Sequence, residues 1–184
     1  MKIVVAITGA SGAIYARQTL ERLLESPEVE HITLVYSDTA REVAAFEGQT
    51  MPEDPRIETA DNGDLFSPAA SGSSRFDAMI VVPCSVGTLG RIACGTSQTL
   101  IERAADVMLK ERRRLVLVVR EAPYSLIHLR NMTAVTEAGG IVVPASPSFY
   151  SHPADVESLC MSVVERALSA AGVGIECFEW RGRG

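Results

Sequence analysis

Five short apolar runs recur along this chain of 184 residues, and they constrain its fold more than any other feature. Each run is rich in β-branched residues and nearly continuous, which is typical of strands covered on both faces. The runs occupy residues 2–8, 31–37, 77–83, 114–120 and 140–145. A strand buried on both faces needs helices above and below it, so the runs predict an α/β architecture.

Stretches with helical periodicity separate these runs. They cover residues 13–25, 39–48, 85–93, 98–111, 124–139 and 154–172. This alternation predicts right-handed βαβ units and a three-layer, doubly wound parallel sheet of the flavodoxin-like or Rossmann-like kind. Residues 49–75, rich in Pro, Asp, Ser and Gly, are expected to form an irregular surface excursion, and 180–184 a loose tail. A chain of this length is expected to form one domain, residues 1–184.

Composition argues against several classes of function. The net charge of −6 gives no basic field for nonspecific nucleic-acid binding. No apolar run approaches the roughly 20 residues of a membrane span, and the first one breaks at Gly9, too early for a signal peptide. The four cysteines form no CxxC pair or Cys/His cluster, which disfavours a zinc site and a disulfide framework. We therefore expect a cytoplasmic protein without a metal site.

The first candidate site is the turn ITGASGA, residues 7–13, between the first run and the first helix. Backbone N–H groups at a helix N-terminus bind anions. The turn is compatible with a dinucleotide pyrophosphate, with a single phosphate or flavin-like group, or with no ligand. Tyr15 stands where a dinucleotide fingerprint needs a small residue, and the chain has no Tyr-x-x-x-Lys pair, so a dehydrogenase is disfavoured.

The segment PCSVGT, residues 83–88, repeats this arrangement after the third run. Ser85 and Thr88 are spaced to cap the next helix and to face a bound anion. The carboxyl ends of parallel strands meet at one edge of a sheet, so the two turns together predict a phosphate cradle. The plainer alternative is that Ser85 serves as an N-cap and nothing more.

Several longer segments together resemble the UbiX-type flavin prenyltransferases. They are TGASGA, SDTAREVAAFE (37–47), PCSVGTLGRIACG (83–95), the block 103–132 and GGIVVPASPSFY (139–150). The resemblance implies a flavodoxin-like or Rossmann-like fold and a homo-oligomer, typically a dodecamer, with active sites at subunit contacts. It also implies a metal-free reaction that joins the dimethylallyl group of dimethylallyl phosphate to N5 and C6 of reduced FMN. The product, prenylated FMN, would serve a UbiD-type decarboxylase.

The resemblance assigns roles to residues at matching positions. Flavin contacts are expected at both turns and after the second and fourth runs, at Gly9, Ala10, Ser11, Ser37, Ser85, Val86, Gly87, Thr88 and Arg120. The substrate phosphate is expected at Lys110, Tyr150 and Arg166, with Arg103 reaching in from a neighbouring subunit. Cations and donors placed there would stabilise the charge that develops on the leaving group. Without the resemblance, the sequence predicts that Lys110 lies at a solvated helix end, that Arg166 is a surface charge and that Tyr150 anchors a loop.

Glu121 is the candidate proton carrier, with Glu47 as a second candidate and Ser11 as a residue that orders flavin and substrate. The alternatives are an ion pair between Glu121 and Arg120 and a surface position for Glu47. The chain departs from the family at Val86-Gly87, where Met-Lys is common, and at Ser97-Gln98, where Asp-Asn is common. One positive charge is therefore missing beside the expected flavin site.

Two rival functions remain open at this point. An FMN-dependent cysteine decarboxylase shares the scaffold, but its Pro-x-Met-Asn-x-x-Met-Trp segment has no counterpart here. An FMN carrier or chaperone that passes the flavin to a decarboxylase would perform no chemistry. It would not need Lys110, Glu121 and Arg166 together.

Overall fold

The five apolar runs all form strands of one parallel sheet in the computed structural model, which describes residues 1–178; the expected tail 180–184 lies outside them. Its strands are β1 (Lys2–Ile7), β2 (His31–Tyr36), β3 (Ile57–Ala60), β4 (Ala78–Cys84), β5 (Arg114–Val119) and β6 (Ile141–Pro144). Their order across the sheet is β3-β2-β1-β4-β5-β6, and every neighbouring pair is parallel. The strand order therefore reverses between β1 and β4.

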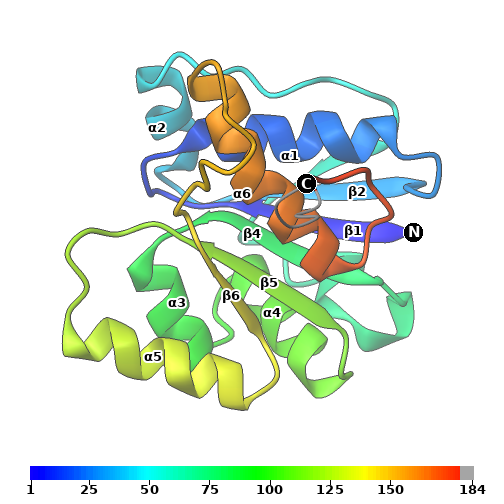
Figure 1. Ribbon diagram of the computed structural model, residues 1–184. Helices are drawn as coiled ribbons and strands as arrows, with labels where there is room; N and C mark the ends of the chain where they lie inside the picture. The colour runs from blue at the N-terminus through cyan, green and yellow to red at the C-terminus, as the bar shows by residue number, and fades with distance from the viewer. Residues whose placement is uncertain (179–184) are drawn as a thin grey trace.

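Helices cover both faces of this sheet, as Figure 1 shows. On one face lie α1 (Ala13–Glu25) and α6 (Val156–Ala171); on the other lie α3 (Val86–Ala93), α4 (Leu100–Lys110) and α5 (Leu126–Glu137). Successive strand residues point to opposite faces. Ile3 and Val5 pack in the core beneath α1 and α6, while Val4 and Ala6 pack in the core beneath α4. The predicted doubly wound α/β fold is confirmed.

The segment 49–75 is more ordered than the sequence indicated. It contains the edge strand β3, which pairs with β2 from Ile32↔Ile57 to Val35↔Ala60, and the short 3₁₀ turns η1 (Pro68–Ala70) and η2 (Gly72–Ser74). The expectation of a wholly irregular excursion was wrong. A four-residue edge strand whose positions are all at least partly exposed carries too little apolar pattern to stand out from a Pro-rich loop.

The remaining helix, α2 (Ala40–Phe46), follows β2 on the side where the strands end. Connections at that edge carry the sequence-predicted flavin contacts, because each of them follows the carboxyl end of a strand. The edge centred on β1 and β4 is the topological switch point, where open α/β sheets bind their ligands. The fold thus places the candidate site between the turn 8–12 and the turn 83–88.

Candidate active site

The two turns at the switch point are joined by one buried side chain. Thr8 Oγ1 donates to the carbonyl oxygen of Pro83 at 2.7 Å and accepts the N–H of Ser85 at 2.8 Å. Because Thr8 is only 1% exposed, these bonds hold the two helix N-termini in fixed positions relative to each other. The sequence prediction that both turns open on the same edge is confirmed.

The turn before α1 requires glycine at two places. A Cβ at Gly9 would lie 2.0 Å from Thr39 Oγ1, so the backbone could not approach the connection after β2 with any larger residue there. Gly12 has φ 108°, a conformation that favours glycine. These requirements explain the glycine spacing without any ligand, and they bring residues 37–39 against the turn.

An internal carboxylate occupies the N-terminus of α1. Glu47, just after α2, accepts the backbone N–H of Gly12 at 3.0 Å and of Ala13 at 2.7 Å. The anion bound by this turn in the structure is therefore a side chain of the same protein. Glu47 is half-buried at the site, which overturns the alternative that placed it on the open surface.

The charge of Glu47 is stabilised where it sits. Partial burial by itself would raise the pKa of this carboxyl, but the Ser11 side chain, the two N–H groups and the nearby Arg120 guanidinium together hold it below its usual range. Ser11, Glu47 and Arg120 thus form one electrostatic cluster at the carboxyl ends of β1 and β5. A group with a lowered pKa stays ionised at neutral pH, so Glu47 is better suited to accept hydrogen bonds than to donate a proton.

The N-terminus of α3 has free donors. Ser85 Oγ accepts the N–H of Thr88 at 3.2 Å, so its predicted N-cap role is confirmed. Within residues 1–178, no hydrogen bond is recorded for the backbone N–H of Val86 or Gly87. The Ser37 hydroxyl, after β2, is buried and also lacks a partner in this part of the chain. A buried polar group without a partner is costly, so the Ser37 hydroxyl, together with the accessible N–H groups of Val86 and Gly87, fits a ligand with several acceptor oxygens.

Arg120 and Glu121 lie where β5 ends. The N–H of Arg120 donates to the carbonyl oxygen of Cys84, and its guanidinium lies near Glu47 and the buried Tyr15. Burial raises the pKa of Tyr15 to about 12, with the neighbouring Cys160 adding to the shift and Arg120 opposing it. Glu121 accepts the N–H of Ala122 at 2.9 Å. Among the described residues no ion pair joins Arg120 to Glu121, so the purely structural alternative is not supported.

Lys110 lies away from this edge within one chain, whereas Arg103, near the start of α4, is held by partners of its own. Lys110 ends α4 beside the amino end of β5, where it pairs with Glu111. Arg120 follows the carboxyl end of that six-residue strand, which spans about 20 Å. Arg103 is paired with Asp106 at 2.6 Å and donates to the carbonyl oxygen of Ala70. A single copy therefore does not bring Lys110 to Arg120, and Arg103 is engaged by Asp106 and Ala70.

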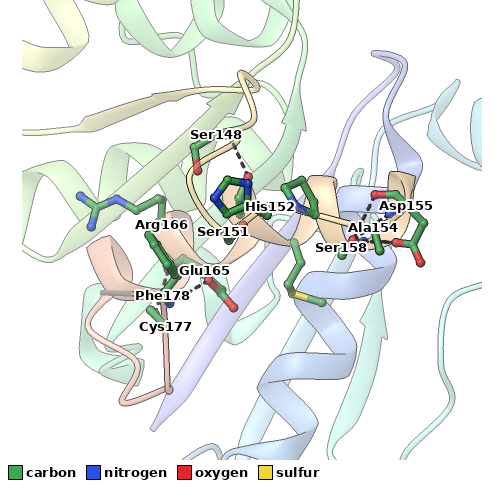
Figure 2. A pocket seen from close by; sticks show the side chains of 13 residues that line it. Ser148, Ser151, His152, Ala154, Asp155, Ser158, Glu165, Arg166, Cys177 and Phe178 are labelled. Carbon is green, nitrogen blue, oxygen red and sulfur yellow. Dashed lines mark hydrogen bonds between the residues drawn. The ribbon is translucent and has the colours of Figure 1, made fainter. Parts of the chain in front are cut away.

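Tyr150 and Arg166 lie around the segment 148–155, which follows the carboxyl end of β6. Arg166, on α6, lines a cavity of about 450 Å³ together with that segment and Phe178. Figure 2 shows Arg166 and Asp155 at opposite ends of this cavity. Phe178 N–H donates to Glu165 at 3.3 Å, which fixes the chain after α6 against the cavity. Arg166 and Tyr150 are both exposed, at positions open to another molecule.

Sequence reasoning missed some residues near the switch point. Arg91 on α3 donates to Thr88 Oγ1 at 3.2 Å and lines a cavity of about 300 Å³ with Ser37 and Asp38. The sequence does carry a signal for Arg91, because it lies one helical turn after the PCSVGT segment. It does not directly follow a strand, where the candidate residues were expected. The ring of Tyr15, the residue that disfavours a dinucleotide in the sequence, lies close to Gly12 in the structure.

The described residues offer no metal site and no membrane-spanning helix, but they do offer groups that suit a phosphate. No group of three or more His, Cys, Asp or Glu side chains in residues 1–178 is arranged to hold a metal ion. In the same range, every helix is too short or too polar to cross a lipid bilayer. The free N–H groups of α3, the unpartnered Ser37 hydroxyl and the guanidinium groups at the carboxyl edge fit a phosphate-bearing flavin.

The fold and this edge define a doubly wound α/β protein with two helix N-termini at its switch point, and the Flavoprotein family model matches residues 1–168. A flavin prenyltransferase UbiX from Thermoplasma acidophilum is 47% identical over 177 residues, which cover 95% of this chain and 96% of the relative. The chain belongs to this family and, within it, to the UbiX-type flavin prenyltransferases.

Solved structures support the same assignment. A UbiX protein called AnUbiX, solved with FMN and dimethylallyl pyrophosphate, superposes with a TM-score of 0.88 at 42% identity, covering 100% of this chain and 98% of that one. A dodecameric FMN-dependent UbiX-like decarboxylase from Escherichia coli gives a TM-score of 0.90 at 40% identity, covering 99% of this chain and 100% of that one.

Proposed function

We propose that this protein is a flavin prenyltransferase that joins the dimethylallyl group of dimethylallyl phosphate to N5 and C6 of reduced FMN. The observation that carries the proposal is the near-complete, 42%-identical match to a chain solved with FMN and dimethylallyl pyrophosphate. The geometry agrees with it, because the carboxyl edge offers donors for a flavin phosphate beside the Ser11–Glu47–Arg120 cluster. Residues 1–184 are proposed to act as one domain.

Different residues of this chain would hold the phosphate and the ring system of the flavin. The Val86 and Gly87 N–H groups, with Ser37, Ser85 and Thr88, would hold the flavin phosphate. Arg120 lies further along the edge, where its guanidinium would contact the ring system. Gly9, Ala10 and Ser11 would border the ring rather than the phosphate, because the N–H groups of Gly12 and Ala13 already bind Glu47. When bound, reduced FMN supplies the nucleophilic N5 and C6 atoms.

The leaving phosphate needs cations, and one copy does not place Lys110 at Arg120. Lys110, Tyr150, Arg166 and Arg103 are proposed to surround that phosphate in an assembly of several copies. Preplaced ammonium, guanidinium and phenol groups stabilise the charge developing on the leaving oxygens, which a metal ion does in other enzymes. Glu121 would accept the proton released from C6 at its carboxylate, since its partly exposed position after β5 leaves it accessible.

Assembly of identical subunits is part of this proposal. On α5 only Val135 is buried, whereas Leu126, Ile127 and Leu129 are 61%, 67% and 47% exposed. An apolar helix face of this kind marks an interaction surface. The similar E. coli protein is a dodecamer. We propose a homo-oligomer, a dodecamer by similarity, that works in the cytoplasm and delivers prenylated FMN to a UbiD-type decarboxylase.

Mass spectrometry of the flavin tests the activity. The protein is incubated anaerobically with reduced FMN and dimethylallyl phosphate, and the extracted flavin is expected to be heavier by one five-carbon unit. A parallel reaction with the diphosphate compares the two leaving groups. Recovery of unmodified FMN from an enzyme that binds it tightly would overturn the proposal and favour the carrier alternative.

A further inference from the structure

The cavity of about 300 Å³ at the carboxyl edge has donors without partners but carries acidic groups. It lies between the end of β2 and the N-termini of α3 and α4, and Ser37 and Thr88 contribute hydroxyls to it. Asp38 and Glu102 also line it, and both are acidic. Among the described residues lining this cavity, Arg91 supplies the positive charge.

Arg91 is held in place by a buried carboxylate. Its Nε donates to Glu102 Oε1 at 2.6 Å, and Glu102 is only 3% exposed. The other oxygen of Glu102 accepts the N–H groups of Gln98 and Thr99 at the start of α4. Both carboxylate oxygens therefore have fixed partners, and the guanidinium is oriented by the helix cap of α4.

The guanidinium lies beside the first turn of α3, next to Gly87 and Thr88. Its Nη2 donates to Thr88 Oγ1 at 3.2 Å, while Nη1 has no hydrogen bond recorded within residues 1–178. A Cβ at Gly87 would lie 3.5 Å from Nη1, so the guanidinium passes directly over the first turn of α3. The Arg91 side chain is 49% exposed and remains accessible to a ligand from the cavity.

We propose that Arg91 binds the phosphate monoester of the flavin and makes this chain select FMN over riboflavin. The inference rests on the proposed function, since it identifies a further residue that recognises the same cofactor. A dianion at the N-terminus of α3 would receive the Val86 and Gly87 N–H groups and the Ser37 hydroxyl, and the guanidinium would neutralise it. Without Arg91, two carboxylates would face that dianion, which opposes binding.

Fluorescence titration with oxidised FMN and riboflavin tests the assignment without any turnover. In Arg91→Ala, loss of a charge-assisted contact is expected to raise the FMN dissociation constant about 10–100-fold and the riboflavin constant less than about twofold. Arg41→Ala is the matched control: Arg41 stacks on Tyr36 in a neighbouring cavity that shares Ser37 and Asp38. It is expected to change both constants less than about threefold.

Two further variants keep the test decisive. Arg91→Ala leaves Glu102 buried without its cation, which threatens folding. The double variant Arg91→Ala/Glu102→Gln removes that charge and keeps the cap of α4. Adding Gly87→Lys returns a cation over the first turn of α3 and is expected to restore most of the FMN affinity.

Unchanged discrimination between FMN and riboflavin in the folded double variant would overturn the inference, as would an equal loss of FMN affinity in Arg41→Ala. Failure of the proposed function gives a different result. In that case the wild type would bind FMN in an Arg91-dependent way but would not prenylate it.

Discussion

Replacement of Glu47 would test whether an internal carboxylate organises the flavin edge. Its carboxylate accepts two backbone N–H groups at the start of α1 and a hydrogen bond from the Ser11 side chain. Each such bond contributes about 1 kcal/mol net, and relief of the partial burial of the charge offsets part of the sum. Glu47→Ala is therefore expected to lower the free energy of unfolding by about 2 kcal/mol.

The pH dependence of this effect follows from the lowered pKa of Glu47. Because the folded state favours the ionised form, the stabilisation is complete above the ordinary value of 4.5 and is lost as the pH falls through the lower folded-state value. Glu47→Gln keeps an oxygen acceptor without the charge and is expected to cost about 1 kcal/mol at neutral pH. The difference between wild type and Glu47→Gln should shrink as the pH falls below 4.5.

Urea unfolding followed by circular dichroism measures these free energies. Replacement of the exposed Glu53 by alanine is the control for removing a glutamate without such contacts. For a chain of this size, about 2 kcal/mol corresponds to a fall in Tm of about 4–8 °C. A Glu47→Ala protein within about 0.5 kcal/mol of the Glu53→Ala control at neutral pH would refute the reasoning.

Three other predictions concern the chemistry. Lys110→Ala is expected to keep FMN bound but to slow prenylation about 100-fold or more, because a cation at the leaving group acts mainly as charge develops; unchanged progress curves would contradict its role. Glu121→Gln is expected to slow turnover while FMN affinity and Tm stay unchanged, and wild-type rates would make Glu121 structural. Mixing Lys110→Ala with Arg120→Ala subunits after dissociation and reassembly is expected to recover activity, whereas a site confined to one chain would leave the mixture inactive.

The sequence was sufficient to predict the elements whose pattern is local. The helix predicted over residues 13–25 coincides with α1. Gly12 before it has a left-handed conformation and Ser26 after it is extended, so both residues mark its ends. β1, β2 and β4 are buried on both faces apart from their ends, which the continuous apolar runs predicted. β3 escaped prediction because it has only four residues and all of them are at least partly exposed, so no continuous apolar run marks it.

The site was predictable only in part. Ser85 was recognised because its cap is local and ends at Thr88, three residues on. The contact of Glu47 with Gly12 spans 35 residues and depends on where α2 ends, which no local pattern encodes. Arg91 was overlooked because its partner Glu102 lies on another helix, and only their packing turns a half-exposed arginine into an oriented one.

The positions of Lys110 and Arg120 show how a parallel sheet divides a site. Both flank β5, so proximity in the sequence suggests a shared site, yet a strand places its two ends at opposite edges. The helix N-termini at the carboxyl edge can bind a flavin. The same helices end at the amino edge, so cations in their last turns lie far from that flavin. If Lys110 acts on the substrate phosphate, a second copy must turn its amino edge toward the first copy's flavin. Mutations at the contact between copies would then impair catalysis without weakening FMN binding.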